Sequence, residues 1–292
     1  MPSNLRSPLF GMALVGFGAI GFGLMPLFAR AAYAEGLSPL SLLVWRFAIA
    51  VFCCLPWLPR ILAARRDFLI ALVAGAGYMA SMLFYFVALK ELSVALTVLI
   101  LFTYPLFTIL IGWLGFGARL TRANLIAALL VLLAAGLILS PDTLGDAPVL
   151  PVLLGFLPPL AYALFIHLAA RRLSHIAIPV RLSGVFSGGL VAMLLIGFGW
   201  EGGITLPGSM LAWGAAAALA VLSTFGALGL LLLGAPLAGP ERSAIAGAGE
   251  LITSLLVGLL AFAEPVSPAM LGGAALILAA IFVSARIDHE KT

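Results

Sequence analysis

Long apolar runs separated by short polar segments dominate the sequence from one end to the other. The runs are about 20 residues long, which is the length that an α-helix needs to cross the hydrocarbon core of a bilayer. Prolines, glycines and charged residues mark the gaps between them. The pattern predicts ten membrane-spanning helices, with ranges 9–33, 39–58, 68–89, 94–116, 123–139, 149–170, 178–200, 210–233, 239–265 and 267–285.

Composition leads to the same class of protein. Of the 292 residues, 64% are hydrophobic and 9% are charged, and the mean hydropathy is +1.24. A soluble domain carries roughly 25% charged residues. No window is long and polar enough for a separate soluble domain, so we expect an all-α integral membrane protein with short loops.

The basic residues are distributed unevenly between alternate loops. One side holds eleven of them, namely Arg6, Arg60, Arg65, Arg66, Arg119, Arg122, Arg171, Arg172, Arg242, Arg286 and Lys291. The other side holds two, Arg30 and Lys90, and also the acidic residues Glu35, Glu91, Asp142, Asp146, Glu201 and Glu264. This bias predicts that both termini lie in the cytoplasm. The basic residues form no patch, so we expect no nucleic-acid partner.

The two halves of the chain, residues 1–145 and 146–292, have matching span lengths and loop positions. A shift of 145 residues lays Arg119 on Glu264 and Pro105 on Glu250. Because five spans are an odd number, the second half must enter the membrane from the opposite side. The sequence therefore predicts two inverted-topology five-helix repeats, a plan found in secondary transporters whose binding site lies between the repeats.

One carboxylate, Glu250, falls near the middle of the range 239–265, which the pattern predicts as a single helix. It shares a face with Ser243, Gly247 and Ser254. An ionised group at that depth costs several kcal/mol unless it is paired or faces water. Three roles are open for Glu250, namely an ion pair with an arginine, contact with a substrate amine, and transfer of a coupling proton. Arg46, about seven residues inside its span, is expected to balance a carboxylate.

Tyrosines and prolines supply the other candidate residues. Tyr78 lies too deep for a headgroup anchor, so it forms either an interhelical hydrogen bond or a cavity wall that stacks on a flat ligand. Tyr85, nearer the end of the span, is expected to anchor at the membrane interface. Pro105 frees the carbonyl group of Leu101, and Pro158 lies on the same face as Tyr162. These prolines either kink their helices only, or also shape a cavity.

The candidate site follows from these positions. The expected substrate-binding residues are Tyr78, Met82, Leu101, Tyr104, Pro158, Tyr162, Ser243, Ala246 and Glu250. The expected coupling or gating residues are Glu250, Arg46 and Pro105. We expect no metal, because no His, Cys or acid lies near His167 at ligand spacing, and no cofactor. Ser223 and Thr224 either line a pore or bond back to their own helix.

Short motifs carry a resemblance to a known family. They are Trp45-Arg46-Phe47, Ala88-Leu89 with Ala95, Tyr104-Pro105-Leu106, and Ala263-Glu264-Pro265. The chain resembles the drug/metabolite transporter superfamily in its ten-span EamA-type branch, and within it most resembles bacterial aromatic amino acid exporters. The second half departs from the pattern, since Glu250 replaces the mid-span proline.

The resemblance implies a secondary transporter of the bacterial cytoplasmic (inner) membrane. It would export small organic metabolites, such as aromatic or other amino acids, by alternating access, and would function as a monomer among membrane lipids. A multidrug, nucleoside or nucleotide-sugar carrier is the alternative within the superfamily. A nucleotide-sugar carrier should place several cations inside the spans, whereas Arg46 alone is deep.

Two other classes of protein fit the sequence less well. An intramembrane enzyme would need a nucleophile with a base, or a set of metal ligands, at membrane depth, and the sequence offers neither. A membrane scaffold that transports nothing would have no reason to keep a repeat with buried polar residues. We therefore expect a protein that is not an enzyme.

Overall fold

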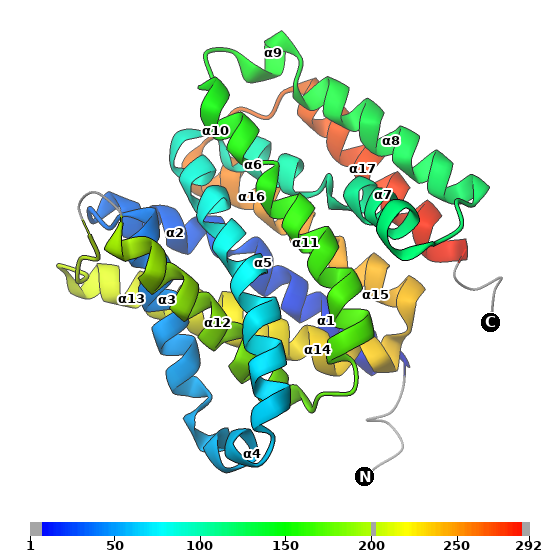
Figure 1. Ribbon diagram of the computed structural model, residues 1–292. Coiled ribbons are helices and arrows are strands. Elements are labelled where there is room, and N and C mark those ends of the chain that lie inside the picture. Colours follow the sequence, from blue (N-terminus) through cyan, green and yellow to red (C-terminus); the bar gives the residue numbers. More distant parts are fainter. Residues whose placement is uncertain (1–7, 200–202, 288–292) are drawn as a thin grey trace.

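The computed structural model describes residues 8–199 and 203–287, and helices account for most of them (Figure 1). Among the residues used above, Arg6, Trp200, Glu201 and Lys291 lie outside the described residues, as do the side chains of Asp142 and Arg286. The all-α class expected from the sequence is confirmed for the described part of the chain.

The first half of the chain folds into short and long helices in alternation. They are α1 (Pro8–Gly23), α2 (Met25–Ala34), α3 (Pro39–Cys53), the 3₁₀ turn η2 (Leu55–Trp57), α4 (Leu58–Ala63), α5 (Arg65–Glu91), α6 (Val94–Leu101), α7 (Tyr104–Phe116), α8 (Arg122–Ile138) and α9 (Pro141–Leu144).

The second half continues in the same manner, with two π-helical turns inside longer helical stretches. Its elements are α10 (Val149–Leu154), α11 (Leu157–Leu168), the π-helix η3 (Ala169–Leu173), α12 (Ile178–Phe198), α13 (Met210–Ala220), the π-helix η4 (Val221–Gly226), α14 (Ala227–Ala238), α15 (Pro240–Gly247), α16 (Gly249–Phe262) and α17 (Pro268–Ile287).

Each of the ten predicted segments contains helix. Within residues 8–199 and 203–287, seven helical stretches are long and apolar enough to cross a membrane. An eighth is counted if α3 and its continuation Leu55–Ala63, bent by 44°, form one span. The remaining two, Arg122–Ile138 and Pro268–Val283, are shorter apolar helices, and α8 and α17 pack along each other (Figure 1). The chain is thus a multi-pass membrane protein, and the count of ten spans stays a prediction.

The prediction of one continuous helix over 239–265 is wrong. The segment breaks at Ala248 into α15 and α16, and α16 ends at Phe262 with Ala263 in the left-handed region (φ 49°). Gly247 and Gly249 flank the break, and glycine is about 1 kcal/mol less favourable than alanine inside a helix. Glu250 therefore lies at the second position of a helix.

Two breaks predicted from prolines are present. The α6 helix ends at Leu101, and α7 begins at Tyr104 with Pro105 in its first turn. Likewise α10 ends at Leu154, and Pro158 lies in the first turn of α11. Proline lacks an N–H group and its ring clashes with the carbonyl group four residues earlier, so each helix restarts just before its proline.

Close helix packing rests on small residues. A Cβ atom added to Gly75 of α5 would lie 2.5 Å from Cα of Val185 in α12, and one added to Gly184 would lie 2.6 Å from Cβ of Ala71. Since lipid tails are as apolar as the side chains, such close backbone approach is a main source of helix association in membranes.

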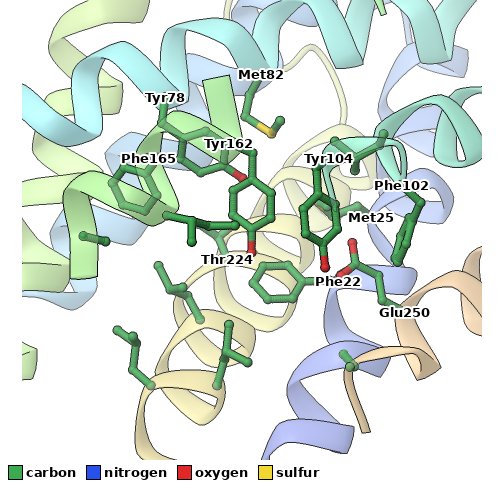
Figure 2. A pocket seen from close by; sticks show the side chains of 18 of the residues that line it. Phe22, Met25, Tyr78, Met82, Phe102, Tyr104, Tyr162, Phe165, Thr224 and Glu250 are labelled. Carbon is green, nitrogen blue, oxygen red and sulfur yellow. The ribbon is translucent and has the colours of Figure 1, made fainter. Parts of the chain in front are cut away.

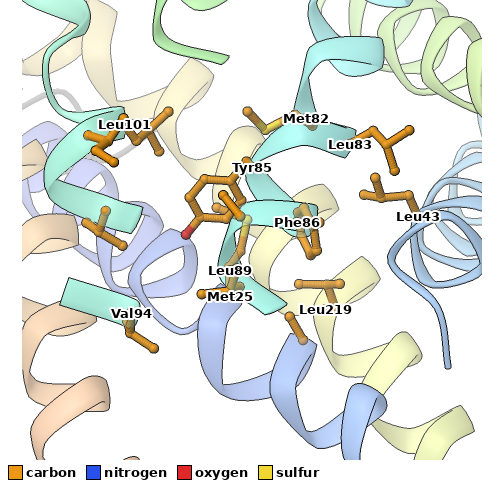
Figure 3. Packing of buried hydrophobic residues seen from close by; sticks show 14 of the residues in the cluster. Met25, Leu43, Met82, Leu83, Tyr85, Phe86, Leu89, Val94, Leu101 and Leu219 are labelled. Atoms are coloured by element: carbon orange, nitrogen blue, oxygen red, sulfur yellow. The ribbon is translucent and has the colours of Figure 1, made fainter. Parts of the chain in front are cut away.

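The buried core lies around the second half of α5 (Figure 3). Tyr85 is 2% exposed there and packs edge-on against Phe86 at 5.4 Å between ring centroids. The expectation that Tyr85 anchors at the membrane interface is therefore wrong, because its ring is buried in the core and does not reach the surface.

Candidate functional site

A cavity of about 440 Å³ lies where interrupted helices meet. Its wall takes Phe22 and Met25 from the break between α1 and α2, and Leu101, Phe102 and Tyr104 from the break between α6 and α7. Gly247, Ala248 and Glu250 come from the break between α15 and α16, and Thr224 comes from η4. The volume falls within the range of about 300–1,000 Å³ that is usual for small-molecule sites.

Aromatic rings form one continuous part of the wall (Figure 2). Tyr78 of α5 lies between Phe165 and Tyr162 of α11, with ring centroids 4.9 Å and 5.2 Å away. Tyr162 meets Tyr104 edge-on at 5.0 Å, and Tyr104 continues to Phe102 at 6.0 Å. Such a set of rings can stack on the flat part of a ligand and offer hydroxyl groups at its edge.

Glu250 provides an acidic group on the wall, on the side of Phe102 and Tyr104 (Figure 2). Its position in the first turn of α16 suits a negative charge, because the helix dipole is positive at that end. Among the described side chains, none forms a hydrogen bond or an ion pair with its carboxylate. No arginine pair is therefore found for Glu250 among the described side chains, and its three possible roles stay predictions.

Arg46 is the basic counterpart on the same wall and is 3% exposed. Its Nε donates to Oγ1 of Thr224 at 2.6 Å, and its guanidinium lies 5.3 Å from the ring centroids of Phe47 and Phe86. Its Nη1 is buried without a hydrogen-bond partner. The expected carboxylate partner is not found among the described residues, and a buried polar group without a partner costs about 1–3 kcal/mol, more when it is charged.

The cavity brings together most of the residues predicted for substrate binding. Tyr78, Met82, Leu101, Tyr104, Tyr162, Ser243 and Glu250 line it, as does Arg46. Pro158, Ala246 and Pro105 do not line it. The two prolines lie in the first turns of α11 and α7, where they interrupt the helices but do not line the cavity. The roles of these residues stay predictions.

Sequence reasoning missed several wall residues. Phe102 directly precedes Thr103 at a break, and Phe165 follows Tyr162 by three residues on α11, so both could have been found by extending the predicted faces. Ala19 and Phe22 of α1 also line the cavity, but no polar side chain near them distinguishes them from lipid-facing positions.

The histidine considered as a metal ligand has protein partners instead. Nε2 of His167 lies 2.9 Å from the carbonyl oxygen of Thr108, and its ring stacks on Phe116 at 4.8 Å. No group of three or more His, Cys, Asp or Glu side chains that could hold a metal ion occurs within 8–199 and 203–287.

Fold and cavity together define a multi-pass helical membrane protein with a small-molecule-sized hollow at its helix breaks. Residues 9–140, somewhat less than half of the chain, match the model of the EamA-like transporter family. No curated protein matches the chain. One solved structure, described only as the crystal structure of a protein, is similar with a TM-score of 0.66 and 21% sequence identity, covering 96% of this chain and 98% of that chain. At that identity the likeness concerns the fold alone.

Proposed function

We propose that the protein is a secondary transporter that exports small organic metabolites, aromatic amino acids first, by alternating access through the central cavity. The observation that carries this proposal is the cavity at the meeting point of interrupted helices. Irregular backbone at membrane depth is tolerated only where it is buried in protein or lines a cavity, and broken helices around a midplane site are typical of transporters. The family match of residues 9–140 points to the same class.

Two features of the fold support an inverted repeat. The shift of 145 residues lays the break at Thr103 on the break at Ala248, and Pro105 on Glu250, each at the second position of its helix. Helix packing also matches between the halves. The α1 helix packs on α14 and α16, and its counterpart α11 packs on the corresponding helices α5 and α7. Both relations are expected if residues 146–292 repeat residues 1–145 in the opposite orientation.

The proposed cargo follows from the wall chemistry and from sequence resemblance. Tyrosine and phenylalanine rings suit an aromatic side chain, and Glu250 suits an amine. The expected likeness to the bacterial aromatic amino acid exporter YddG, which rests on the short EamA-type motifs, points to the same cargo. The uneven loop charges support a place in the bacterial inner membrane with both termini in the cytoplasm, and one chain that holds both halves of the cavity can act as a monomer.

The test is transport by the purified protein in liposomes. Counterflow of labelled phenylalanine should be inhibited by other aromatic amino acids, and less by nucleosides or cationic dyes. Tyr78→Ala and Tyr104→Ala should raise KM, whereas Tyr85→Phe, a change in the core outside the cavity, should leave it unchanged. Preference for nucleosides or dyes would move the protein to another carrier class, and no movement of any solute would favour a scaffold.

A further inference from the structure

The cavity wall holds a cation that is fixed in place and incompletely bonded. Nη1 of Arg46 is buried and has no hydrogen-bond partner. We propose that Arg46 is the carboxylate-binding residue of this cavity and thereby selects substrates that carry a carboxylate. This inference rests on the proposed function in one respect, namely that the cavity receives a small solute.

The guanidinium is held by the residues around it. Thr224 accepts a hydrogen bond from Nε of Arg46, and its own hydroxyl donates to the carbonyl oxygen of Leu219 at 2.8 Å, which fixes the direction of both bonds. The rings of Phe47 and Phe86 lie against the guanidinium. The planar donors of arginine match a carboxylate in geometry, and here they are positioned before any ligand binds.

Charge leads to the same inference. The ion pairs found among the described residues join Arg30 to Glu264 and His175 to Asp67, and neither involves Arg46. A cation this deep in a membrane protein usually has a partner or a function. A ligand carboxylate against the part of Arg46 that lines the cavity would supply the missing counter-charge.

The wall therefore combines one basic and one acidic side chain with aromatic rings around the same cavity. Arg46 and Glu250 are the charged residues among those that line the cavity in the described part of the chain. A zwitterion with a flat apolar body satisfies both charges at once. An amine alone leaves Arg46 without its partner, and a carboxylic acid alone leaves Glu250 without its partner.

The test compares three ligands that share one ring and differ in charge: phenylalanine, phenethylamine and 3-phenylpropionate. Binding to the purified full-length protein is measured by calorimetry, so that it does not depend on transport. Phenethylamine, which lacks the carboxylate, should bind about tenfold or more weakly than phenylalanine, since a hydrogen bond to a charged group is worth that much.

Arg46→Gln should weaken the binding of phenylalanine and of 3-phenylpropionate by about tenfold or more, and should change the binding of phenethylamine by no more than about twofold. Arg46→Lys, which keeps the charge and loses the planar fork, should recover part of this loss. Arg60→Gln, at an exposed arginine of α4, should bind all three ligands as the wild type does. If Arg46→Gln does not fold, Thr224→Val serves as the second variant. It removes the acceptor of the Nε hydrogen bond of Arg46, so it should weaken the binding of the two carboxylate ligands and not that of phenethylamine.

Two results would overturn the inference. One is an unchanged ratio of the three affinities in Arg46→Gln or Thr224→Val, or an equal loss for all three, as a purely structural arginine would give. The other is a wild type that binds phenethylamine as tightly as phenylalanine or binds neither carboxylate. A wild type that binds phenylalanine selectively but moves no solute would instead reject the proposed function and leave this inference standing.

Discussion

Glu264 and Arg30 form an ion pair that joins the two halves of the chain. Nη1 of Arg30, in the middle of α2, lies 2.6 Å from Oε1 of Glu264, which follows α16. The same carboxylate accepts the backbone N–H of Val94 at 2.8 Å and 3.1 Å, at the first residue of α6. One side chain thus links α2 and the start of α6 in the first half to the end of α16 in the second half.

Removal of this carboxylate should destabilise the fold. The paired side chains are 23% and 11% exposed, so Glu264→Ala should lower the free energy of unfolding by about 2–3 kcal/mol, near the lower end of the cost of breaking a buried pair. Thermal unfolding in detergent measures the change. Glu91→Ala, at an exposed carboxylate at the end of α5, is the matched control, and an equal shift in both variants would contradict the expectation.

A second prediction concerns the contact between α5 and α12. Gly75→Ala places a methyl group 2.5 Å from Cα of Val185, so the helices must separate, and overpacking of this kind costs about 1–3 kcal/mol. Gly77→Ala, two residues along the same helix, meets no heavy atom within 4 Å and should be neutral or slightly stabilising. Equal unfolding temperatures for the two variants would show that the contact tolerates a side chain.

The helix positions could be predicted from the sequence because the bilayer allows few backbone structures. A membrane span must satisfy its own backbone hydrogen bonds, so apolar runs become helices. Capping residues then set the starts, as when Ser38, Ser93, Thr121 and Ser209 each accept the backbone N–H three residues later. These starts agree with the predicted starts to within one residue.

The cavity could be predicted only in part. Tyr78 and Tyr104 stand out because their hydroxyl groups lie deep inside apolar runs, and Pro105 predicts a break in its helix. The break at Ala248 has no proline, and only flanking glycines indicate it. The bond between Arg46 and Thr224 joins residues 178 positions apart, so it depends on how α3 meets η4, which no local pattern in the sequence specifies.

A third prediction separates the roles still open for Glu250. If its carboxylate contacts the substrate amine, Glu250→Gln should raise KM for phenylalanine and phenethylamine by about tenfold and leave 3-phenylpropionate nearly unchanged, the reverse of the pattern expected for Arg46→Gln. Counterflow in liposomes measures this, with Glu91→Gln as the control.

The same variant tests proton transfer by Glu250. Transport by wild type and Glu250→Gln is compared over a range of external pH at saturating substrate. An unchanged pH profile excludes a coupling role for this carboxylate. Loss of the pH dependence together with unaltered KM values would instead reject the amine contact and favour transfer of a coupling proton by Glu250.

The last prediction concerns the break between α6 and α7, which places Leu101 and Tyr104 on the cavity wall. Pro105→Ala removes the clash that interrupts the helix, so the two pieces should join and shift these side chains. Turnover should fall by about tenfold to a hundredfold, since small misplacements of contact residues cost that much, whereas the unfolding temperature should not fall. Pro236→Ala, at an exposed proline inside α14, tests whether loss of any helix proline has this effect. Equal turnover in Pro105→Ala and wild type would mean that the break persists without its proline.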